Sequence, residues 1–512
     1  MRARTDDLIL AVDQGSGSTK ATVVDASGMT VSEAAVPIST ASVGTDGVEI
    51  DAYEIWSSVC ESAAQALVGL HPGRVVALGL SNQRESVVAW DPDSGAPVAP
   101  AVSWQDRRAQ APCDTVERSL SRHEVFERTG LPLSPAFSAA KLSALLDRVD
   151  PDRRAGLRLG TIDAWLLSQL GCTAAVEEGN ASRTQLFDLG RGRWDPELLG
   201  LFNIPVGSLP TPRPSDFAFG TTKDFPPLPD GVPVNAVLAD SHAAFFAQGG
   251  WDPEVVKVTL GTGSSLMRLE RGRSTSPTLC RSVAWNIGGQ RTIALEGNIL
   301  SCGSSLVWLA SILSCSVAEL LALGASADSG GVVLVPAFQG LGAPYWDASA
   351  TALLGGMALH TSRESLARAA MEAVALQVAD VLDEMAPSDE QLQIRVDGGL
   401  CQSDALMQLL ADVVGRPMSV SDATNLSGLG AAFLSGLGIG LWSRDDLEAM
   451  PRSTRTFQPR LPAPDRARMR GRWAETVRRS RAGSPPGSAT GSHDGLGSGV
   501  HTGGIAGSET GA

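Results

Sequence analysis

The chain has 512 residues, of which 43% are hydrophobic and 19% are charged, and its formal net charge is −15. This length predicts two domains of about 200 to 250 residues, each with its own core, and a cleft between them. The acidic composition argues against nucleic acid and membrane as partners. An anionic ligand would therefore need local backbone N–H groups, a few basic side chains or a metal ion.

Cysteine usage and apolar runs bear on the compartment. The seven cysteines are scattered singly without a C-x-x-C pair, which predicts reduced thiols in a cytoplasmic protein. The first apolar run has three residues and follows Asp6 and Asp7, so we expect no signal peptide. The uncharged stretch 425–442 contains five glycines, which favours a closely packed buried helix over a membrane span.

The first predicted element is a strand that runs into a glycine turn and a second strand, "LILAVDQGSGSTKATVV" at residues 8–24. Glycines in such a turn let successive N–H groups converge on an anion, although one such turn is weak evidence. Asp13 ends the first strand. Its carboxylate either caps its own turn or holds a hydrated Mg²⁺ beside phosphate oxygens.

Alternating strands and helices follow, and this alternation indicates an α/β fold. In the first half, we expect helices near 54–67 and 139–149 and strands near 75–82 and 85–91. In the second half, we expect strands near 331–338 and 392–399 and a long amphipathic helix near 364–385.

The predicted boundary between the two domains lies near residues 244–254, which gives domains at 1–246 and 247–481. From Ala482 the sequence is rich in glycine, serine, threonine and proline and nearly lacks large apolar side chains. Such a segment cannot bury enough surface to offset its ordering entropy, so we expect residues 482–512 to be disordered.

The second half opens with an echo of the first. Residues 255–270, "VVKVTLGTGSSLMRLE", again predict strand, glycine turn and strand, and both turns are rich in hydroxyl groups. No G-x-x-x-x-G-K-[ST] motif occurs, so this is not a P-loop protein. Two matched glycine hairpins in two similar halves favour a pair of phosphate-binding turns.

Several further motifs carry a family resemblance. "DQGSGSTKA", "GLSNQRESVVAWD", "AVSWQDRRA", "LADSHAAFFAQGG", "VTLGTGSS", "LVPAFQGLGAPYWD" and "RVDGGLCQSDALMQLLADVVGRP" together resemble the FGGY carbohydrate kinases, in particular the glycerol kinase branch, from residue 8 to about 445. The resemblance implies an α/β fold of duplicated actin-like (ribonuclease H-like) ATPase domains with an interdomain cleft. It also implies an enzyme that transfers phosphate from ATP, with Mg²⁺, to a terminal hydroxyl of a small polyol or sugar.

The resemblance assigns Asp240 as the base that takes a proton from the attacking hydroxyl. Phosphoryl transfer needs mainly positioning and charge stabilisation, with a carboxylate within reach of the nucleophile. From the residues alone, Asp240 would be interpreted as a helix N-cap, because it precedes "SHAAFFA". His242, on the helix that follows, is expected to be structural.

For the substrate, the resemblance implies contacts from Arg84, Glu85, Trp104, Asp240 and Ser241. A polyol offers hydroxyls and C–H faces, which suit a guanidinium, a carboxylate and an indole wall. Taken without the resemblance, "QRE" at residues 83–85 would be a solvated charge pair on a loop.

For ATP, the resemblance implies contacts from residues of both hairpins and of the later adenosine segment, with Asp13 on the magnesium side. These residues are Gly15, Ser16, Gly17, Ser18, Lys20, Gly261, Thr262, Gly303, Gly399 and Ser403. A "DGG" after a strand is otherwise a common turn. Ser403 stands where the family carries an asparagine, which shortens the reach to the base.

Three departures from the glycerol kinase pattern surround the expected substrate pocket. Ala136 replaces a tyrosine of that branch, Ser265 replaces an aromatic residue, and Ser241 replaces a glutamine. Together they predict a roomier and more polar pocket. Our hypothesis is therefore a substrate larger than glycerol, such as a four- or five-carbon polyol or ketose.

Two other functions are weighed against the kinase. An actin-like ATPase that binds protein partners would give no reason for Arg84, Glu85 and Trp104 to occur together. A pseudokinase with a decayed substrate pocket is compatible with the three departures. For the assembly, a homodimer or a homotetramer is left open.

Overall fold

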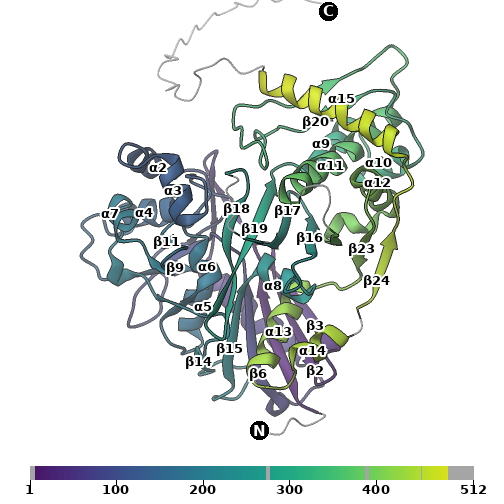
Figure 1. The fold of residues 1–512 in the computed structure, drawn as a ribbon. Helices are drawn as coiled ribbons and strands as arrows, with labels where there is room; N and C mark the ends of the chain where they lie inside the picture. The colour runs from purple at the N-terminus through teal and green to yellow at the C-terminus, as the bar shows by residue number, and fades with distance from the viewer. Residues whose placement is uncertain (1–5, 273–276, 387–390, 451, 483–512) are drawn as a thin grey trace, which may run out of the picture.

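The computed structural model describes residues 6–272, 277–386, 391–450 and 452–482 (Figure 1). A six-stranded sheet with the order β14-β15-β6-β1-β2-β3 forms the centre of the first half. Its strands are β1 (Leu8–Gln14), β2 (Ser18–Asp25), β3 (Thr30–Pro37), β6 (Val75–Asn82), β14 (Gly220–Thr221) and β15 (Pro233–Ala239). β1 and β6 are almost continuously buried because helices cover both faces of the sheet.

A seven-stranded sheet with the order β18-β19-β17-β16-β22-β23-β24 forms the centre of the second half. Its strands are β16 (Val255–Leu260), β17 (Ser264–Leu269), β18 (Cys280–Ile287), β19 (Gln290–Ile299), β22 (Gln393–Asp397), β23 (Met418–Ser421) and β24 (Thr454–Phe457). In each half the first strand of a glycine hairpin pairs in parallel with a later strand, β1 with β6 and β16 with β22. The predicted echo between the halves is therefore an architectural repeat.

The first half also carries a smaller sheet with the order β4-β5-β8-β7-β9 and a group of helices. These elements are β4 (Ala41–Val43), β5 (Gly47–Ile50), β7 (Val87–Trp90), β8 (Ala101–Val102), β9 (Arg158–Thr161), α1 (Ala52–Ala66), α2 (Gln110–Glu117), α3 (Arg122–Thr129), α4 (Ser138–Val149), α5 (Ile162–Gln169), α6 (Glu178–Ser182) and α7 (Pro196–Leu201). Short pairs complete it: β10 (Ala175–Glu177) with β13 (Thr211–Arg213), and β11 (Phe187–Asp188) with β12 (Arg193–Trp194).

Helices pack around the second sheet, with α15 across the top of the view in Figure 1. They are α9 (Gly303–Ile312), α10 (Val317–Ala325), α11 (Arg363–Met385), α12 (Asp404–Val414) and α15 (Ala463–Ala482). α14 (Arg444–Ala449) lies beside the first sheet instead (Figure 1), and its Leu447 belongs to a core cluster with Ile9 and Ala11 of β1. The core of this half lies between α11 and the sheet, where Val374, Val378 and Val381 are fully buried.

Two helices form the junction between the halves, α8 (Asp240–Ala247) and α13 (Leu426–Gly438). α13 comes late in the sequence but packs on β1, β6 and α8 (Figure 1). Its small residues permit a close approach: a Cβ added at Gly430 would lie 1.9 Å from the carbonyl oxygen of Ala243. The prediction of a closely packed buried helix within 425–442 is thus confirmed.

Most predicted elements are confirmed at nearly the expected positions, including α1, α4, α11, β6 and β22. The strand expected at 331–338 is shorter, since β20 covers only Val333–Val335 and pairs only with β21 (Leu353–Gly355). Pro336 follows β20 directly and has no N–H to continue a ladder. Of the segment expected to be a disordered tail, residues 483–512 lie outside the described residues, and Ala482 ends α15.

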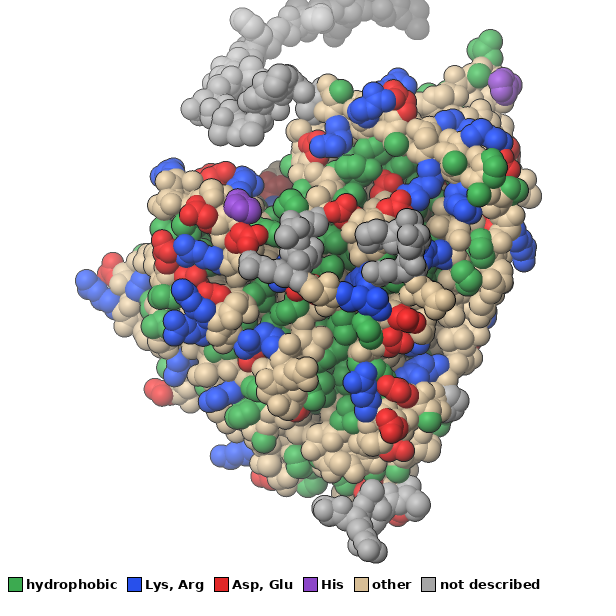
Figure 2. Space-filling model, in the orientation of Figure 1, with side chains coloured by type: hydrophobic (Ala, Val, Ile, Leu, Met, Phe, Trp, Pro, Cys, Tyr) green, Lys and Arg blue, Asp and Glu red, His purple; other side chains and the backbone are tan. Residues whose placement is uncertain are grey.

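Charged side chains of both signs are interspersed over the face in Figure 2, with apolar side chains between them. Among the described residues, no single helix combines the length and the apolar composition of a membrane span. The bent pair α9 and α10, with 93° between its members, reaches that length and composition only when the two helices are taken together.

Candidate active site

The site is built first by the sheet of the first half, where β1, β6 and β15 run parallel and end at the same edge. Register places Asp13 beside Ser81 and Ser81 beside Leu238, two residues before Asp240. Ligand sites in open α/β sheets form at the carboxyl ends of such strands. Pairing of these three strands therefore brings the two predicted carboxylates, Asp13 and Asp240, to one edge of the sheet.

The first glycine hairpin joins β1 to β2 through residues 15–17. The N–H of Gly15 donates to the carbonyl oxygen of Ser18 at 3.0 Å, and the carbonyl oxygen of Gly17 accepts from the N–H of Ile38, also at 3.0 Å. In the ladder, Lys20 lies directly opposite Asp13. These two hydrogen bonds hold the turn, and Asp13 and Lys20 lie on the paired strands at its base.

The second hairpin joins β16 to β17, and the N-terminus of α9 lies against it. The N–H groups of Cys302 and Ser304 both donate to the carbonyl oxygen of Thr262, at 3.1 and 3.0 Å. A Cβ at Gly303 would lie 2.6 Å from the carbonyl oxygen of Gly261, so only glycine permits this approach. The positive end of a helix dipole therefore faces the turn, an arrangement that favours anions.

The predicted adenosine segment follows β22. Gly398 has a φ of +104° and its backbone lies against that of Leu260, whereas a Cβ added at Gly399 would meet no atom within 4 Å. The hydroxyl oxygen of Ser403 accepts from the N–H of Leu406 at 3.2 Å and so caps α12. Ser403 therefore has a structural role in this structure, and its contact with nucleotide stays a prediction.

Asp240 is the first residue of α8, and Ala239 occupies the N-cap position. The N-cap interpretation that the residues alone suggested is therefore wrong. One carboxylate oxygen, Oδ1, accepts from the N–H of Ser241 at 2.6 Å and lies 3.3 Å from Nε of Arg84. Its side chain keeps 36% of its surface exposed. Partial removal from water raises the pKa of Asp240, and Arg84 opposes that rise.

Asp13 shares this environment. Loss of solvent and the neighbouring charge of Asp240 raise the pKa of Asp13 to about 6, while the hydrogen bond from Ser81 Oγ at 2.9 Å and the charge of Lys20 oppose the rise. A cation between Asp13 and Asp240 would relieve their repulsion. No group of three or more His, Cys, Asp or Glu with metal-binding geometry occurs in the described part of the chain. Two carboxylates are a donor set that suits Mg²⁺, whose remaining ligands in proteins are usually water and phosphate oxygens.

On the substrate side, Arg84 and Glu85 are parts of a buried ionic network that joins the two halves. Both terminal nitrogens of Arg84 donate to the carboxylate of Glu296 on β19, at 2.8 and 2.9 Å. Arg183 donates to Glu85 at 2.6 Å and to Glu296 at 2.9 Å. Glu296 is completely buried. Burial alone would raise its pKa, but Arg183 and Arg84 hold it well below the usual range.

The loop that carries these residues is bent sharply. Glu85 has a φ of +62°, and the N–H of Ser86 donates to the carbonyl oxygen of Arg84 at 2.8 Å, which closes a γ-turn. Such positive-φ geometry at a non-glycine residue is costly and concentrates at functional sites. Ser86 Oγ in turn accepts from the N–H of Trp104 at 2.9 Å, and the Trp104 side chain is 39% exposed.

Another hydrogen-bond chain links this loop to the first hairpin. Ser86 Oγ donates to Gln83 at 2.7 Å, and the amide nitrogen of Gln83 donates to Gln14 at 3.0 Å. Gln14 donates to the carbonyl oxygen of Gly15 at 2.7 Å. The predicted substrate and phosphate regions therefore share one polar scaffold.

The three departures from the glycerol kinase pattern are now placed. Ser265 Oγ donates to Glu296 at 3.0 Å, so this serine belongs to the ionic network. The carbonyl oxygen of Ala136 accepts from the buried ammonium of Lys141, which fixes the loop before α4. Ser241 contributes its N–H to Asp240.

Sequence reasoning missed Glu296 and Arg183 as members of the site. The available signal was a single carboxylate inside the apolar run "IALEGNIL", since a charge at a buried strand position needs a partner. His242, expected to be structural, is fully buried, with Nε2 3.2 Å from Ser282 Oγ.

Comparisons with known proteins agree with this geometry. Residues 8–247 match the N-terminal domain of the FGGY family of carbohydrate kinases, and residues 256–438 match its C-terminal domain. The chain is 41% identical over 466 residues to the apulose kinase of Pectobacterium atrosepticum, covering 88% of this chain and 94% of the relative. It is 38% identical over 489 residues to the glycerol kinase of a Geobacter species, covering 93% and 99%. Among solved structures, the Plasmodium falciparum glycerol kinase with ADP has a TM-score of 0.86 and 26% identity, covering 93% and 98%.

Proposed function

The chain belongs to the FGGY family of carbohydrate kinases, and from this premise we propose that it transfers the γ-phosphoryl group of ATP to a terminal hydroxyl of a polyol or ketose larger than glycerol. That it is a carbohydrate kinase with an alcohol acceptor follows from the family. ATP as donor, the residues that act and the preferred acceptor are the proposal. The observation that carries it is the position of Asp240 at the carboxyl edge of β15, beside Arg84.

In the proposed reaction, the carboxylate of Asp240 accepts the proton of the acceptor hydroxyl while the hydroxyl oxygen forms a bond to the γ-phosphorus. The bond between the γ-phosphorus and the β–γ bridging oxygen breaks, and ADP leaves. The N–H of Ser241 and the guanidinium of Arg84 hold this carboxylate in place. The raised pKa of Asp240 makes it a better proton acceptor than an ordinary exposed aspartate. Its partial exposure leaves room for the hydroxyl to approach.

The two hairpins are proposed to bind the phosphates of ATP from opposite halves. Gly15–Ser18 and Lys20 act from the first half, and Gly261, Thr262 and the N-terminus of α9 at Gly303 act from the second. Asp13 would hold Mg²⁺ through water, and the ion would neutralise charge on the phosphates. Gly399 offers open space beside the adenosine segment. Closure of the halves would exclude water from the reacting groups.

The acceptor is proposed to lie between Trp104 and the ionic network. Arg84 and Glu85 already have protein partners, so they act as a fixed polar wall with the remaining donor and acceptor positions facing the ligand. Ala136 and Ser265 are small where glycerol kinases carry aromatic side chains, which leaves room for further carbons. The relative at 41% identity is an apulose kinase, and the ending of "apulose" denotes a ketose.

A coupled ADP-release assay over glycerol, tetritols, pentitols, ketopentoses and apulose tests this proposal. We expect a four- or five-carbon acceptor to have the highest kcat/KM and glycerol to fall at least about tenfold lower, the usual size of discrimination for a pocket with unfilled space. A highest kcat/KM for glycerol would refute the larger substrate. ADP release that no acceptor stimulates would contradict the kinase function itself and favour the actin-like ATPase, whereas no ADP release with any acceptor would favour the pseudokinase.

A further inference from the structure

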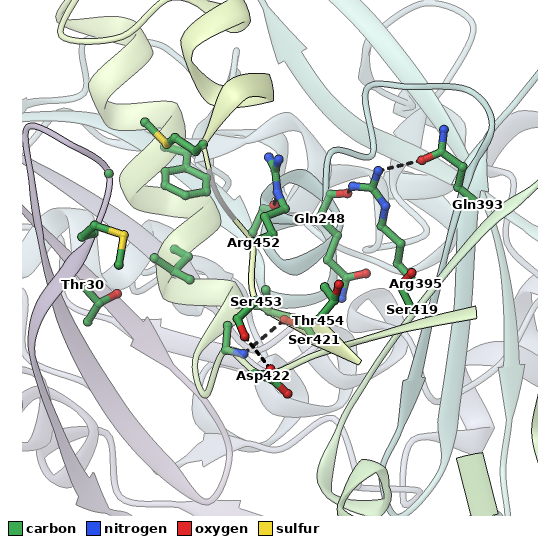
Figure 3. A pocket seen from close by; sticks show the side chains of 18 of the residues that line it. Thr30, Gln248, Gln393, Arg395, Ser419, Ser421, Asp422, Arg452, Ser453 and Thr454 are labelled. Atoms are coloured by element: carbon green, nitrogen blue, oxygen red, sulfur yellow. Dashed lines mark hydrogen bonds between the residues drawn. The ribbon is translucent and has the colours of Figure 1, made fainter. Parts of the chain in front are cut away.

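A cavity of about 610 Å³ lies between the halves (Figure 3). None of the residues that line it belongs to the candidate active site. Its walls come from the β2–β3 turn, the C-terminal end of α8, α13, and the strands β22, β23 and β24. Thr30 of the first half lies across the cavity from Arg395 of the second half in Figure 3. A volume of this size is typical of small-molecule sites.

Two arginines give the wall of the cavity a positive charge. The guanidinium of Arg395 donates to the carbonyl oxygen of Gln248 and, at 2.8 Å, to the side chain of Gln393. Arg452 donates to the carbonyl oxygen of Leu447 at 2.9 Å and more weakly to that of Ala247 at 3.4 Å. Within the described residues, neither guanidinium forms an ion pair with a carboxylate.

Nearby carboxylates are engaged elsewhere. Asp422, on the cavity wall, accepts from Ser453 Oγ at 2.6 Å and pairs with Arg455. Asp252 accepts from the side chain of Gln393, and Glu448 accepts from Arg444 and Trp251. Burial lowers the pKa of both Arg395 and Arg452, and the charge of Arg452 adds to the effect on Arg395. The charges of Asp252 and Glu448 oppose this lowering only in part. These are the surroundings of cations that lack an anion.

The rest of the wall divides into an apolar and a hydroxyl side. Leu426, Leu429 and Phe433 present one face of α13, and Met29 and Met450 lie beside them. Hydroxyl groups lie toward β23 and β24, from Ser419, Ser421, Ser453 and Thr454 (Figure 3). A fitting ligand therefore combines an anionic group with an apolar body.

We propose that this cavity is an effector site for an organic anion with an apolar body, bound with its anionic group between Arg395 and Arg452. Carbonyl oxygens at the C-terminal end of α8 now share these arginines, and Asp240 is the first residue of the same helix. The helix has eight residues and spans about 12 Å. An anion that takes over the arginine donors weakens the hold on this end of α8 and thereby lowers the turnover that depends on Asp240.

Anilinonaphthalene sulfonate is a suitable probe, because it joins a sulfonate to an apolar aromatic body and fluoresces when bound. Phenylnaphthylamine, the same body without the sulfonate, is the matched neutral probe. We expect the full chain to bind the sulfonate at least about tenfold more tightly, since a charge-assisted hydrogen bond contributes this much. ADP should not displace it. Equal affinity for the two probes, or full displacement by ADP, would overturn the site.

Substitutions in the wall of the cavity test whether the probe binds there. Arg395→Gln combined with Arg452→Gln should weaken sulfonate binding about tenfold or more and leave the neutral probe unchanged. Arg74→Gln combined with Arg118→Gln, both on the exposed surface of the first half, is the charge-matched control. Ala423→Trp, at the exposed rim of the cavity, should weaken both probes and serves if the arginine variant fails to fold. Unaltered sulfonate binding in these variants would refute the assignment.

The effector role is measured separately and rests on the proposed function. Saturating sulfonate probe should lower kcat at least about twofold in the parent chain and leave the arginine variant unaffected. If no acceptor is turned over, the proposed function fails while the binding measurements still decide the site. Probe that binds at the arginines without changing kcat or KM would overturn the effector role.

Discussion

The carboxylates of the candidate active site fall into two groups that the protein treats in opposite ways. Asp13 and Asp240, at the edge of the first sheet, lie beside each other with few cationic partners, and the pKa of each is raised. Glu296, inside the second sheet, is completely buried between Arg84 and Arg183, and its pKa is lowered. Ionisation of Asp13 and Asp240 together costs free energy, whereas the guanidinium groups of Arg84 and Arg183 stabilise the charge of Glu296.

This difference separates ligand chemistry from scaffolding. A carboxylate that its own protein leaves under-compensated can accept a proton or a cation from a ligand. A carboxylate with several charge-assisted hydrogen bonds has no such capacity, but it fixes the groups that donate to it. We therefore propose proton transfer and ion binding for the edge pair and positioning for Glu296. Each assignment predicts a different consequence of substitution.

The largest expected effect concerns Asp240. Asp240→Asn keeps the size of the side chain and removes the proton acceptor, so kcat should fall about a thousandfold or more. ADP binding, measured by titration calorimetry, should stay within about threefold of the parent value because Asp240 lies on the acceptor side. Asp152→Asn, on an exposed loop, is the control. A variant with more than a tenth of the parent kcat would refute Asp240 as the base.

The second effect concerns Glu296. Glu296→Gln leaves Arg84 and Arg183 buried without their shared carboxylate, and breaking such a buried pair costs about 3 kcal/mol of unfolding free energy. Urea denaturation measures this loss. Glu117→Gln, which breaks an exposed ion pair with Arg122, should leave the midpoint nearly unchanged. A Glu296 variant as stable as the Glu117 control would contradict the positioning role.

The two groups also differ in how far the sequence predicts them. The hairpins, the strand that carries Asp13 and the small-residue helix α13 follow from local patterns of apolar residues and glycines. Glu296 and Arg183 meet although 113 residues separate them, and no local pattern encodes that meeting. For Asp240, local reasoning suggested the N-cap position. In the structure Ala239 occupies that position and α8 begins at Asp240, whose carboxylate faces Arg84.

The third effect concerns Ala136, in the region that we propose binds the acceptor. Ala136→Tyr restores the aromatic side chain of glycerol kinases, fills part of the proposed space and adds a hydroxyl. The ratio of kcat/KM for glycerol to that for the best larger acceptor should rise about tenfold. Competition assays with both acceptors measure the ratio directly. Ala99→Tyr, outside the candidate site, is the control, and an equal ratio in both variants would show that Ala136 does not limit the acceptor.

The smallest effect concerns Asp13 and depends on pH. Because the pKa of Asp13 is about 6 in the folded chain and 3.8 for an ordinary aspartate, the folded state binds more protons than the unfolded state between these values. Stability therefore falls as the pH rises through this window. Asp13→Asn should therefore stabilise the ligand-free protein by about 1 kcal/mol at pH 7, less than the full shift implies because Asp13 is partly exposed. The gain should vanish near pH 4, where the aspartate is protonated in the folded chain. Thermal unfolding at both pH values, with Asp93→Asn as an exposed control, measures it. A gain of equal size at both pH values would exclude ionisation of Asp13 as its cause and would return this carboxylate to the role of a turn former.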